Sequence, residues 1–157
     1  MPEEFRQSAD SVRALADTFN DIGEICKAAG LQFGYHNHDF EFKQMGEELI
    51  FDILLKNTDP QLVTFEIDLY WIKKAGYNAI DYFKKYPKRF SLWHVKDMAN
   101  TEQGEFAPVG KGKIDFVELF THSEEAGLKY YFVEQDSFTE HKPFESIELS
   151  FKYLNSL

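Results

Sequence analysis

Helical and extended patterns alternate along the chain, and this alternation limits its fold more than any other feature. Apolar residues recur at three- and four-residue spacing from Val12 to Ala29, which predicts a long first helix that ends at Gly30. Four short strand patterns follow, each with a helical pattern after it. The predicted strands span residues 31–36, 63–68, 90–95 and 130–133, and the predicted helices span residues 7–29, 48–55, 78–85, 114–126 and 144–154. Such alternation predicts right-handed βαβ units and a parallel sheet.

Length and composition limit the kinds of partner that this chain can have. Its 157 residues predict a single domain that spans residues 1–157. Seventeen basic and 27 acidic residues give a net charge of −10, which disfavours binding to nucleic acid or to an anionic membrane. Cys26 is the only cysteine, so no internal disulfide can form, and no apolar run approaches the roughly 20 residues of a membrane-spanning helix. We therefore expect a cytoplasmic protein.

Ionisable side chains occupy the ends of all four predicted strands. Residues two positions apart share a face of a strand, and the last residues in phase are His36 and His38, Glu66 and Asp68, His94 and Lys96, and Glu134 and Asp136. A buried parallel strand is normally apolar almost throughout. The carboxyl ends of parallel strands meet at one end of the sheet, where α/β proteins bind their ligands. The side chains expected to converge there are His36, Asp68, His94 and Glu134.

Two imidazoles and two carboxylates form a mixed set of nitrogen and oxygen ligands. Such a set suits Mn²⁺, Fe²⁺, Co²⁺ or Zn²⁺ better than Ca²⁺. A single histidine on a strand is more often a hydrogen-bonded core or rim residue than a metal ligand. The prediction of a metal site therefore depends on the four residues coinciding in register.

Five segments of the chain resemble motifs of the xylose-isomerase-like sugar-phosphate isomerase/epimerase TIM barrels, in the same order. They are residues 34–42 (GYHNHDFEF), 65–71 (FEIDLYW) with 74–76, 94–98 (HVKDM), 109–116 (VGKGKIDF) and 133–136 (VEQD). The resemblance covers nearly the whole chain. It implies half of a TIM (β/α)8 barrel, with four parallel strands equivalent to barrel strands 5–8 and flanking helices. It also implies a divalent-metal-dependent reaction on a sugar or sugar phosphate, in which a proton moves next to a carbonyl.

The same resemblance implies a metal site at the strand ends. The ligands that it implies for Mn²⁺, Zn²⁺, Co²⁺ or Mg²⁺ are His36, Asp68, His94 and Glu134. Many members of the family have a glutamate where this chain has His36. The ligand from this strand could therefore also be His38 or Glu41.

Catalytic roles are expected for Glu134, His38 and Lys96. Glu134 or His38 would carry the proton. Lys96 follows His94 in phase, so it would either neutralise charge that develops on the substrate or form an ion pair with Asp97, Glu134 or Asp136.

Substrate contacts are expected from Trp71, Glu41 and Lys111. An indole ring such as that of Trp71 can stack on a sugar. Lys111 lies in a glycine-rich turn before a helix that Asp115 is expected to cap, and such a turn either binds a phosphate or is simply a tight loop.

Four strands supply only half of a barrel, which needs eight. Half of a barrel leaves two strand edges unpaired. The chain could be a C-terminal fragment, an open half-barrel packed against a neighbour, or one half of a homodimer that closes the barrel, and we predict the homodimer.

Two other functions stay open beside the isomerase or epimerase. One is a lyase, dehydratase or hydrolase of a 3-keto sugar or keto-inositol, since elimination can proceed with a single acid/base group. The other is a binding module or truncated relic without catalytic activity.

Overall fold

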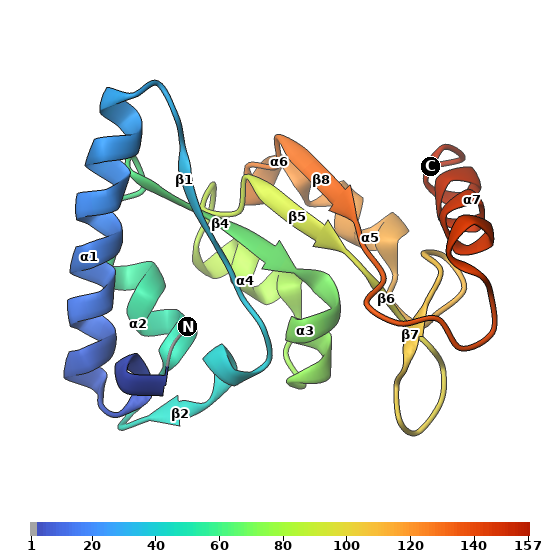
Figure 1. Ribbon diagram of the computed structural model, residues 1–157, viewed down its shortest axis with the longest axis horizontal. Coiled ribbons are helices and arrows are strands. Elements are labelled where there is room, and N and C mark those ends of the chain that lie inside the picture. Colours follow the sequence, from blue (N-terminus) through green and yellow to red (C-terminus); the bar gives the residue numbers. More distant parts are fainter. Residues whose placement is uncertain (1–2) are drawn as a thin grey trace.

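The computed structural model describes residues 3–157 and contains a four-stranded parallel sheet with the strand order β1-β4-β5-β8 (Figure 1). Its strands are β1 (Phe33–His36), β4 (Val63–Asp68), β5 (Leu92–Val95) and β8 (Tyr130–Val133). Every neighbouring pair is parallel, and the register sets His36 beside Glu66 and Asp68 beside His94. The predicted α/β fold with four parallel strands and flanking helices is confirmed, and each strand lies within its predicted range.

The predicted helices are also present. They are α1 (Ala9–Ala28), α2 (Ile50–Asn57), α4 (Ala79–Lys85), α5 (Phe116–Thr121), α6 (Ser123–Ala126) and α7 (Pro143–Leu154). The prediction of one helix over residues 114–126 is wrong in one respect. The backbone leaves the helical region at His122 (φ −97°, ψ 9°), so this segment forms the two short helices α5 and α6. Within residues 3–157, none of the helices combines the length and apolar character that a membrane span requires.

Several short elements were not predicted. They are the 3-10 turns η1 (Glu3–Arg6) and η2 (Phe40–Phe42), the helix α3 (Leu69–Lys74), and the paired strands β2 (Gln44–Met45) with β3 (Glu48–Leu49) and β6 (Asp97–Met98) with β7 (Phe106–Ala107). None of them is longer than six residues, which is too short for a periodic pattern to stand out in the sequence.

The two faces of the parallel sheet differ in character. Helices cover one face, where Phe51 of α2 packs against Phe65 with ring centroids 5.5 Å apart and Phe83 of α4 stacks on Trp93 at 5.0 Å. All four of these aromatic side chains are fully buried. The opposite face carries the polar strand residues. In Figure 1, α1 lies at one end of the sheet beside β1, and α7 lies at the other end.

Strand β8 is an open edge of the sheet. Its four side chains are all exposed, with fractions of 67% at Tyr130, 44% at Tyr131, 50% at Phe132 and 43% at Val133. Helix α7 does not cover this strand, because its buried side faces a loop, where the Ser150 hydroxyl accepts a hydrogen bond from the Val109 N–H. An apolar strand edge exposed to water is a surface that pairs readily with another strand.

Candidate metal centre

The carboxyl ends of β1, β4 and β5 bring His36, Asp68 and His94 together. The Nε2 atom of His36 lies 3.0 Å from the Oδ2 atom of Asp68 and 3.0 Å from the Nδ1 atom of His94. The Nδ1 atom of His94 is in turn 3.5 Å from the same carboxylate oxygen. One ligand atom from each residue lies within 4.8 Å of the other two. The predicted convergence of these three side chains is confirmed, and their role as ligands stays a prediction.

Asp68 is fully buried, and its two carboxylate oxygens have different partners. The Oδ1 atom caps α3 by accepting hydrogen bonds from the N–H groups of Tyr70 (3.0 Å) and Trp71 (2.9 Å). This contact leaves Oδ2 directed at the histidines. Burial by itself would raise the pKa of Asp68, but the hydrogen bonds with His36 and His94 and the charge of Lys96 hold that pKa well below its ordinary value.

Lys96 and Glu134 border the three residues. The Lys96 ammonium is almost completely buried and lies 3.2 Å from Asp68, 2.6 Å from Glu134 and 2.9 Å from Asp136. Lys96 was expected either to neutralise charge on the substrate or to form ion pairs, and the structure contains the ion pairs. Glu134, whose side chain is 47% exposed, approaches the Nδ1 atom of His94 at 3.4 Å. Burial by itself would raise the pKa of Glu134, but the hydrogen bond and charge of Lys96, together with the charge of His94, outweigh it and lower this pKa below its usual value.

His38 and Trp71 lie beside the cluster. The ring of His38 is centred 4.9 Å from that of His36 and 5.6 Å from that of Trp71. Burial, together with the neighbouring His36, lowers the pKa of His38, which favours its neutral form. The indole N–H of Trp71 is buried and has no hydrogen-bond acceptor among the described residues.

Glu66 adds a further carboxylate to the cluster. The strand pattern indicated that it shares a face with Asp68, but no function was predicted for it. Its Oε1 atom lies 3.4 Å from the Nε2 atom of His94, on the ring side away from Asp68. Burial lowers the pKa of His94, but the surrounding carboxylates outweigh that effect and raise it, with Asp68 and Glu66 contributing most. Glu66 precedes Asp68 by two positions in the same strand, so both side chains lie on the same face, and this spacing could have assigned Glu66 to the site.

The structure does not bring Glu41 and Lys111 to the cluster. Glu41 is fully buried, and its oxygens accept hydrogen bonds from the Tyr35 hydroxyl and from the His38 N–H. Lys111 is exposed and lines a separate cavity of about 370 Å³ beside Gln135 and His141. Their contact with a substrate stays a prediction.

The turn that carries Lys111 is organised by Asp97, which is almost completely buried. Its carboxylate accepts hydrogen bonds from the N–H groups of Met98 (2.7 Å), Gly110 (2.9 Å), Gly112 (2.8 Å) and Ile114 (3.1 Å). A Cβ atom at Gly112 would lie 2.3 Å from Oδ1 of Asp97. This arrangement explains the glycine at that position and supports the interpretation of this segment as a tight loop.

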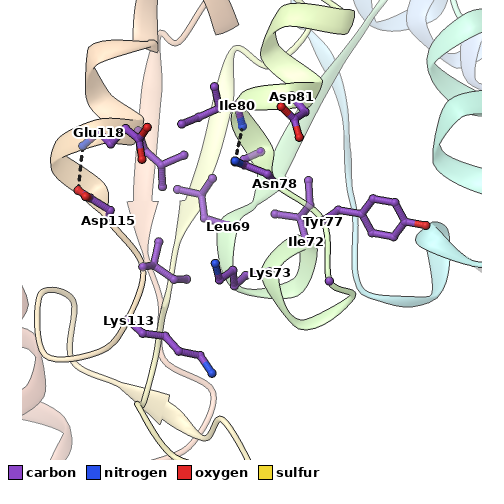
Figure 2. A pocket seen from close by; sticks show the side chains of 14 residues that line it. Leu69, Ile72, Lys73, Tyr77, Asn78, Ile80, Asp81, Lys113, Asp115 and Glu118 are labelled. Carbon is purple, nitrogen blue, oxygen red and sulfur yellow. Dashed lines mark hydrogen bonds between the residues drawn. The ribbon is translucent and has the colours of Figure 1, made fainter.

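A larger cavity of about 420 Å³ lies on the helical side of the molecule, between α3, α4 and α5 (Figure 2). Two of its polar side chains are helix caps, since Asn78 accepts from the Ile80 N–H and Asp115 accepts from the Glu118 N–H, as the dashed lines in Figure 2 show. The predicted capping role of Asp115 is therefore confirmed. Because two of its polar side chains cap helices, whereas His36, Asp68 and His94 meet at the strand ends, we place the candidate site at the strand ends and not in this cavity.

Comparisons with known proteins agree with this architecture. A family model described as a xylose isomerase-like TIM barrel matches residues 2–157. The inosose dehydratase of Clostridium perfringens is 28% identical over 143 residues, which cover 79% of this chain and 48% of that protein. The inosose dehydratase of Geobacillus kaustophilus is 27% identical over 163 residues, which cover 92% of this chain and 52% of that protein.

Among solved structures, a sugar phosphate isomerase/epimerase from Parabacteroides distasonis has a TM-score of 0.85 and 34% sequence identity, and the match covers 95% of this chain and 53% of that chain. The chain thus spans about half the length of the curated relatives and solved structures that it matches.

Proposed function

Because the chain belongs to the xylose isomerase-like TIM-barrel family, we propose that it is a divalent-metal-dependent isomerase or epimerase of a sugar or sugar phosphate. The reaction moves a proton on the carbon next to a carbonyl. The observation that carries this proposal is the cluster of His36, Asp68 and His94 at the carboxyl ends of three neighbouring strands.

The donor set of this cluster fits a divalent cation. Two imidazole nitrogens and one carboxylate oxygen come from three different strands and lie within 4.8 Å of one another, a mixture that suits Mn²⁺, Zn²⁺ or Co²⁺. His36, Asp68 and His94 would hold the cation, and Glu134 would join them as the fourth ligand from β8. A bound cation would polarise the substrate carbonyl and so acidify the adjacent C–H bond.

The residues around the cluster supply the proton transfer. Glu134 is half-exposed and has a lowered pKa, so it is ionised at neutral pH and can accept a proton. His38, held in its neutral form, is the other candidate to carry the proton. The ammonium of Lys96 balances the negative charge that develops on the substrate oxygen. Trp71, beside His38, offers an aromatic face for a sugar ring.

A related second function is a dehydratase of a keto-inositol or 3-keto sugar. The curated relatives at 27–28% identity carry the name inosose dehydratase. Beside the three clustered residues, Glu134 is the carboxylate best exposed to accept a proton. One such group suffices for elimination, whereas an isomerase needs two balanced groups.

Product analysis separates the two functions. The protein, loaded with Mn²⁺ or Zn²⁺ in deuterated water, is incubated with aldose and ketose phosphates and, separately, with a keto-inositol. We expect an isomerised or epimerised sugar that keeps its composition and gains one deuterium, with no turnover after treatment with EDTA. A product that has lost water identifies the dehydratase instead. No deuterium uptake from any of these substrates would contradict both functions.

We further propose that two copies of the chain close one barrel. Both outer strands, β1 and β8, have an unpaired edge, and the side chains of β8 are 43–67% exposed. If β8 of each copy lies beside β1 of the other, the two four-stranded sheets form an eight-stranded parallel barrel around a two-fold axis. Such a dimer has a metal cluster from each copy at the same end.

Light scattering during size exclusion tests the dimer. We expect a particle of twice the chain's 18.4 kDa. Replacing exposed residues of the β8 edge (Tyr131→Glu with Val133→Lys) should give a monomer, because charged side chains prevent pairing of strand edges. The control is Val117→Lys, an exposed apolar residue that lies on helix α5 and not on either edge strand, which should leave the dimer intact. A monomeric wild-type protein would contradict the closed dimer.

A further inference from the structure

A buried carboxylate lies five residues beyond His36, outside the proposed metal ligands. Glu41 is located in the 3-10 turn η2, has no solvent-exposed area, and uses both of its oxygens. One oxygen accepts a hydrogen bond from the Tyr35 hydroxyl, and the other accepts one from the His38 N–H at 2.8 Å. A carboxylate buried in this way, with both oxygens occupied, cannot reach a substrate without losing these contacts.

The two partners of Glu41 stand on either side of His36 in the chain. Tyr35 is the residue before it in β1, and His38 follows it by two positions. By bonding to both, Glu41 fixes the two ends of the segment that carries His36 and Asn37. The turn η2 brings the carboxylate back to the strand that precedes it.

A second buried side chain holds the same segment from the opposite direction. Asn37 is fully buried, and its Oδ1 atom accepts a hydrogen bond from the backbone N–H of Asp68 at 3.0 Å. This contact ties the end of β1 to the end of β4. The 3.0 Å separation between His36 Nε2 and Asp68 Oδ2 therefore depends on a segment that is anchored at three points.

In place of the substrate contact or metal ligation expected from the sequence, we infer that Glu41 is a positioning residue, which holds His36 and His38 in place for the metal site and does not itself touch metal or substrate. This inference rests on the proposed function, because it assigns Glu41 a role toward that site. Residues that orient metal ligands support metal binding without touching the metal, and their loss typically costs about 10–100-fold in affinity.

The test compares Glu41 with a matched carboxylate elsewhere. Asp52 is also buried and accepts a hydrogen bond from a tyrosine hydroxyl, that of Tyr86 at 2.8 Å, but it lies on the helical side of the protein. Glu41→Gln is the conservative variant, because its amide oxygen can accept from the His38 N–H while its NH2 group donates to the Tyr35 oxygen. The variants measured are Glu41→Ala, Glu41→Gln and Asp52→Ala.

Titration calorimetry with Mn²⁺ gives the first measurement. We expect Glu41→Ala to bind about tenfold more weakly than wild type. Glu41→Gln and Asp52→Ala should keep the wild-type affinity, although Asp52→Ala is expected to melt at a lower temperature. If Glu41→Ala binds Mn²⁺ as tightly as wild type, the positioning role is refuted.

NMR of the histidine ring protons in the metal-free protein gives the second measurement. Glu41→Ala should shift the signals of His36 and His38 and leave those of His122 and His141 unchanged, whereas Asp52→Ala should leave all four unchanged. A wild-type protein that binds no Mn²⁺ would contradict the proposed function, and this NMR comparison would then decide the positioning role alone. If Glu41→Ala does not fold, Tyr35→Phe replaces it, and unshifted His36 and His38 signals in that variant overturn the inference.

Discussion

Asp68→Asn and His94→Ala are each expected to weaken the binding of Mn²⁺ and Zn²⁺ by more than about 100-fold, which is the upper end of what the loss of an outer-shell partner costs. Asp68 contributes an oxygen that lies close to both histidines, at 3.0 Å from His36 and 3.5 Å from His94. Because Asp68 is fully buried, its replacement leaves both histidines without their buried carboxylate oxygen.

Asparagine at position 68 removes the charge of the proposed metal ligand but keeps the helix cap, so an effect on metal binding can be measured without a large effect on folding. Its amide oxygen can still cap α3 by accepting from the N–H groups of Tyr70 and Trp71, a contact whose loss typically costs about 1 kcal/mol. Titration calorimetry at pH 7 measures the affinity. His122→Ala is the control for His94→Ala, since His122 pairs with Glu125 on the helical side. Equal metal affinities of wild type and Asp68→Asn would contradict a metal site at this cluster and with it the metal dependence of the proposed function.

The strand ends could be predicted from the sequence because their position follows from two local rules. Alternation of side chains set the face of each strand, and parallel strands present their carboxyl ends together. The strand observed at Val63–Asp68 has the predicted bounds, and its last residue is the centre of the cluster. Residues as distant in sequence as His36 and His94 were thus assigned to one site without knowledge of any contact.

The second role of Asp68 could not be predicted in the same way. Helix α3 begins directly after this residue, and six residues are too few to show a helical period. The sequence indicated a ligand at this position, but one carboxylate oxygen caps the helix while the other faces the histidines. Only the backbone geometry of the strand-to-helix junction reveals that the two roles belong to different oxygens.

Asp97 shows where long-range contacts override a local interpretation. Its position next to Lys96 suggested an ion pair, but its oxygens are taken up by backbone N–H groups from residues up to 17 positions later. Lys96 pairs with Glu134 and Asp136, the other two partners that the sequence suggested, and with Asp68. The loop after β7 folds back onto Asp97 through tertiary contacts, and no residue spacing in the sequence predicts them.

Lys96→Met is expected to lower the free energy of unfolding at pH 7 by about 3 kcal/mol, the scale measured when one partner of a buried ion pair is removed. The Lys96 side chain is only 3% exposed, and its ammonium faces the fully buried Asp68. In wild type the pKa of Asp68 is depressed, so its ionised form stabilises the fold above the ordinary carboxyl pKa, and that contribution is lost as the pH falls through the folded value. Without Lys96 the depression is smaller.

The deficit of Lys96→Met should therefore be largest near pH 7 and shrink as the pH falls, and the part due to Asp68 shrinks only below about 4, the ordinary carboxyl pKa, because the folded pKa of Asp68 stays depressed in the variant. His94 adds to this trend. Its pKa is already raised by Asp68, Glu66 and Glu134, and a cluster that lacks Lys96 binds the His94 proton more tightly, which stabilises the variant as the pH falls through the histidine range. Urea unfolding at several pH values measures the deficit, and one that stays constant with pH would show that only packing was lost.

A divalent cation should replace the missing ammonium. Removal of Lys96 leaves Asp68, Glu134 and Asp136 with less compensating charge, so Mn²⁺ should raise the unfolding free energy of Lys96→Met more than that of wild type. Lys85→Met is the control, because Lys85 is 51% exposed where it pairs with Asp52, and the loss of such a pair typically costs less than about 1 kcal/mol. Lys85→Met should gain as much stability from Mn²⁺ as wild type does, and its stability deficit should not shrink as the pH falls. An equal gain from Mn²⁺ in Lys96→Met and wild type would mean that Lys96 and the metal do not share one electrostatic site.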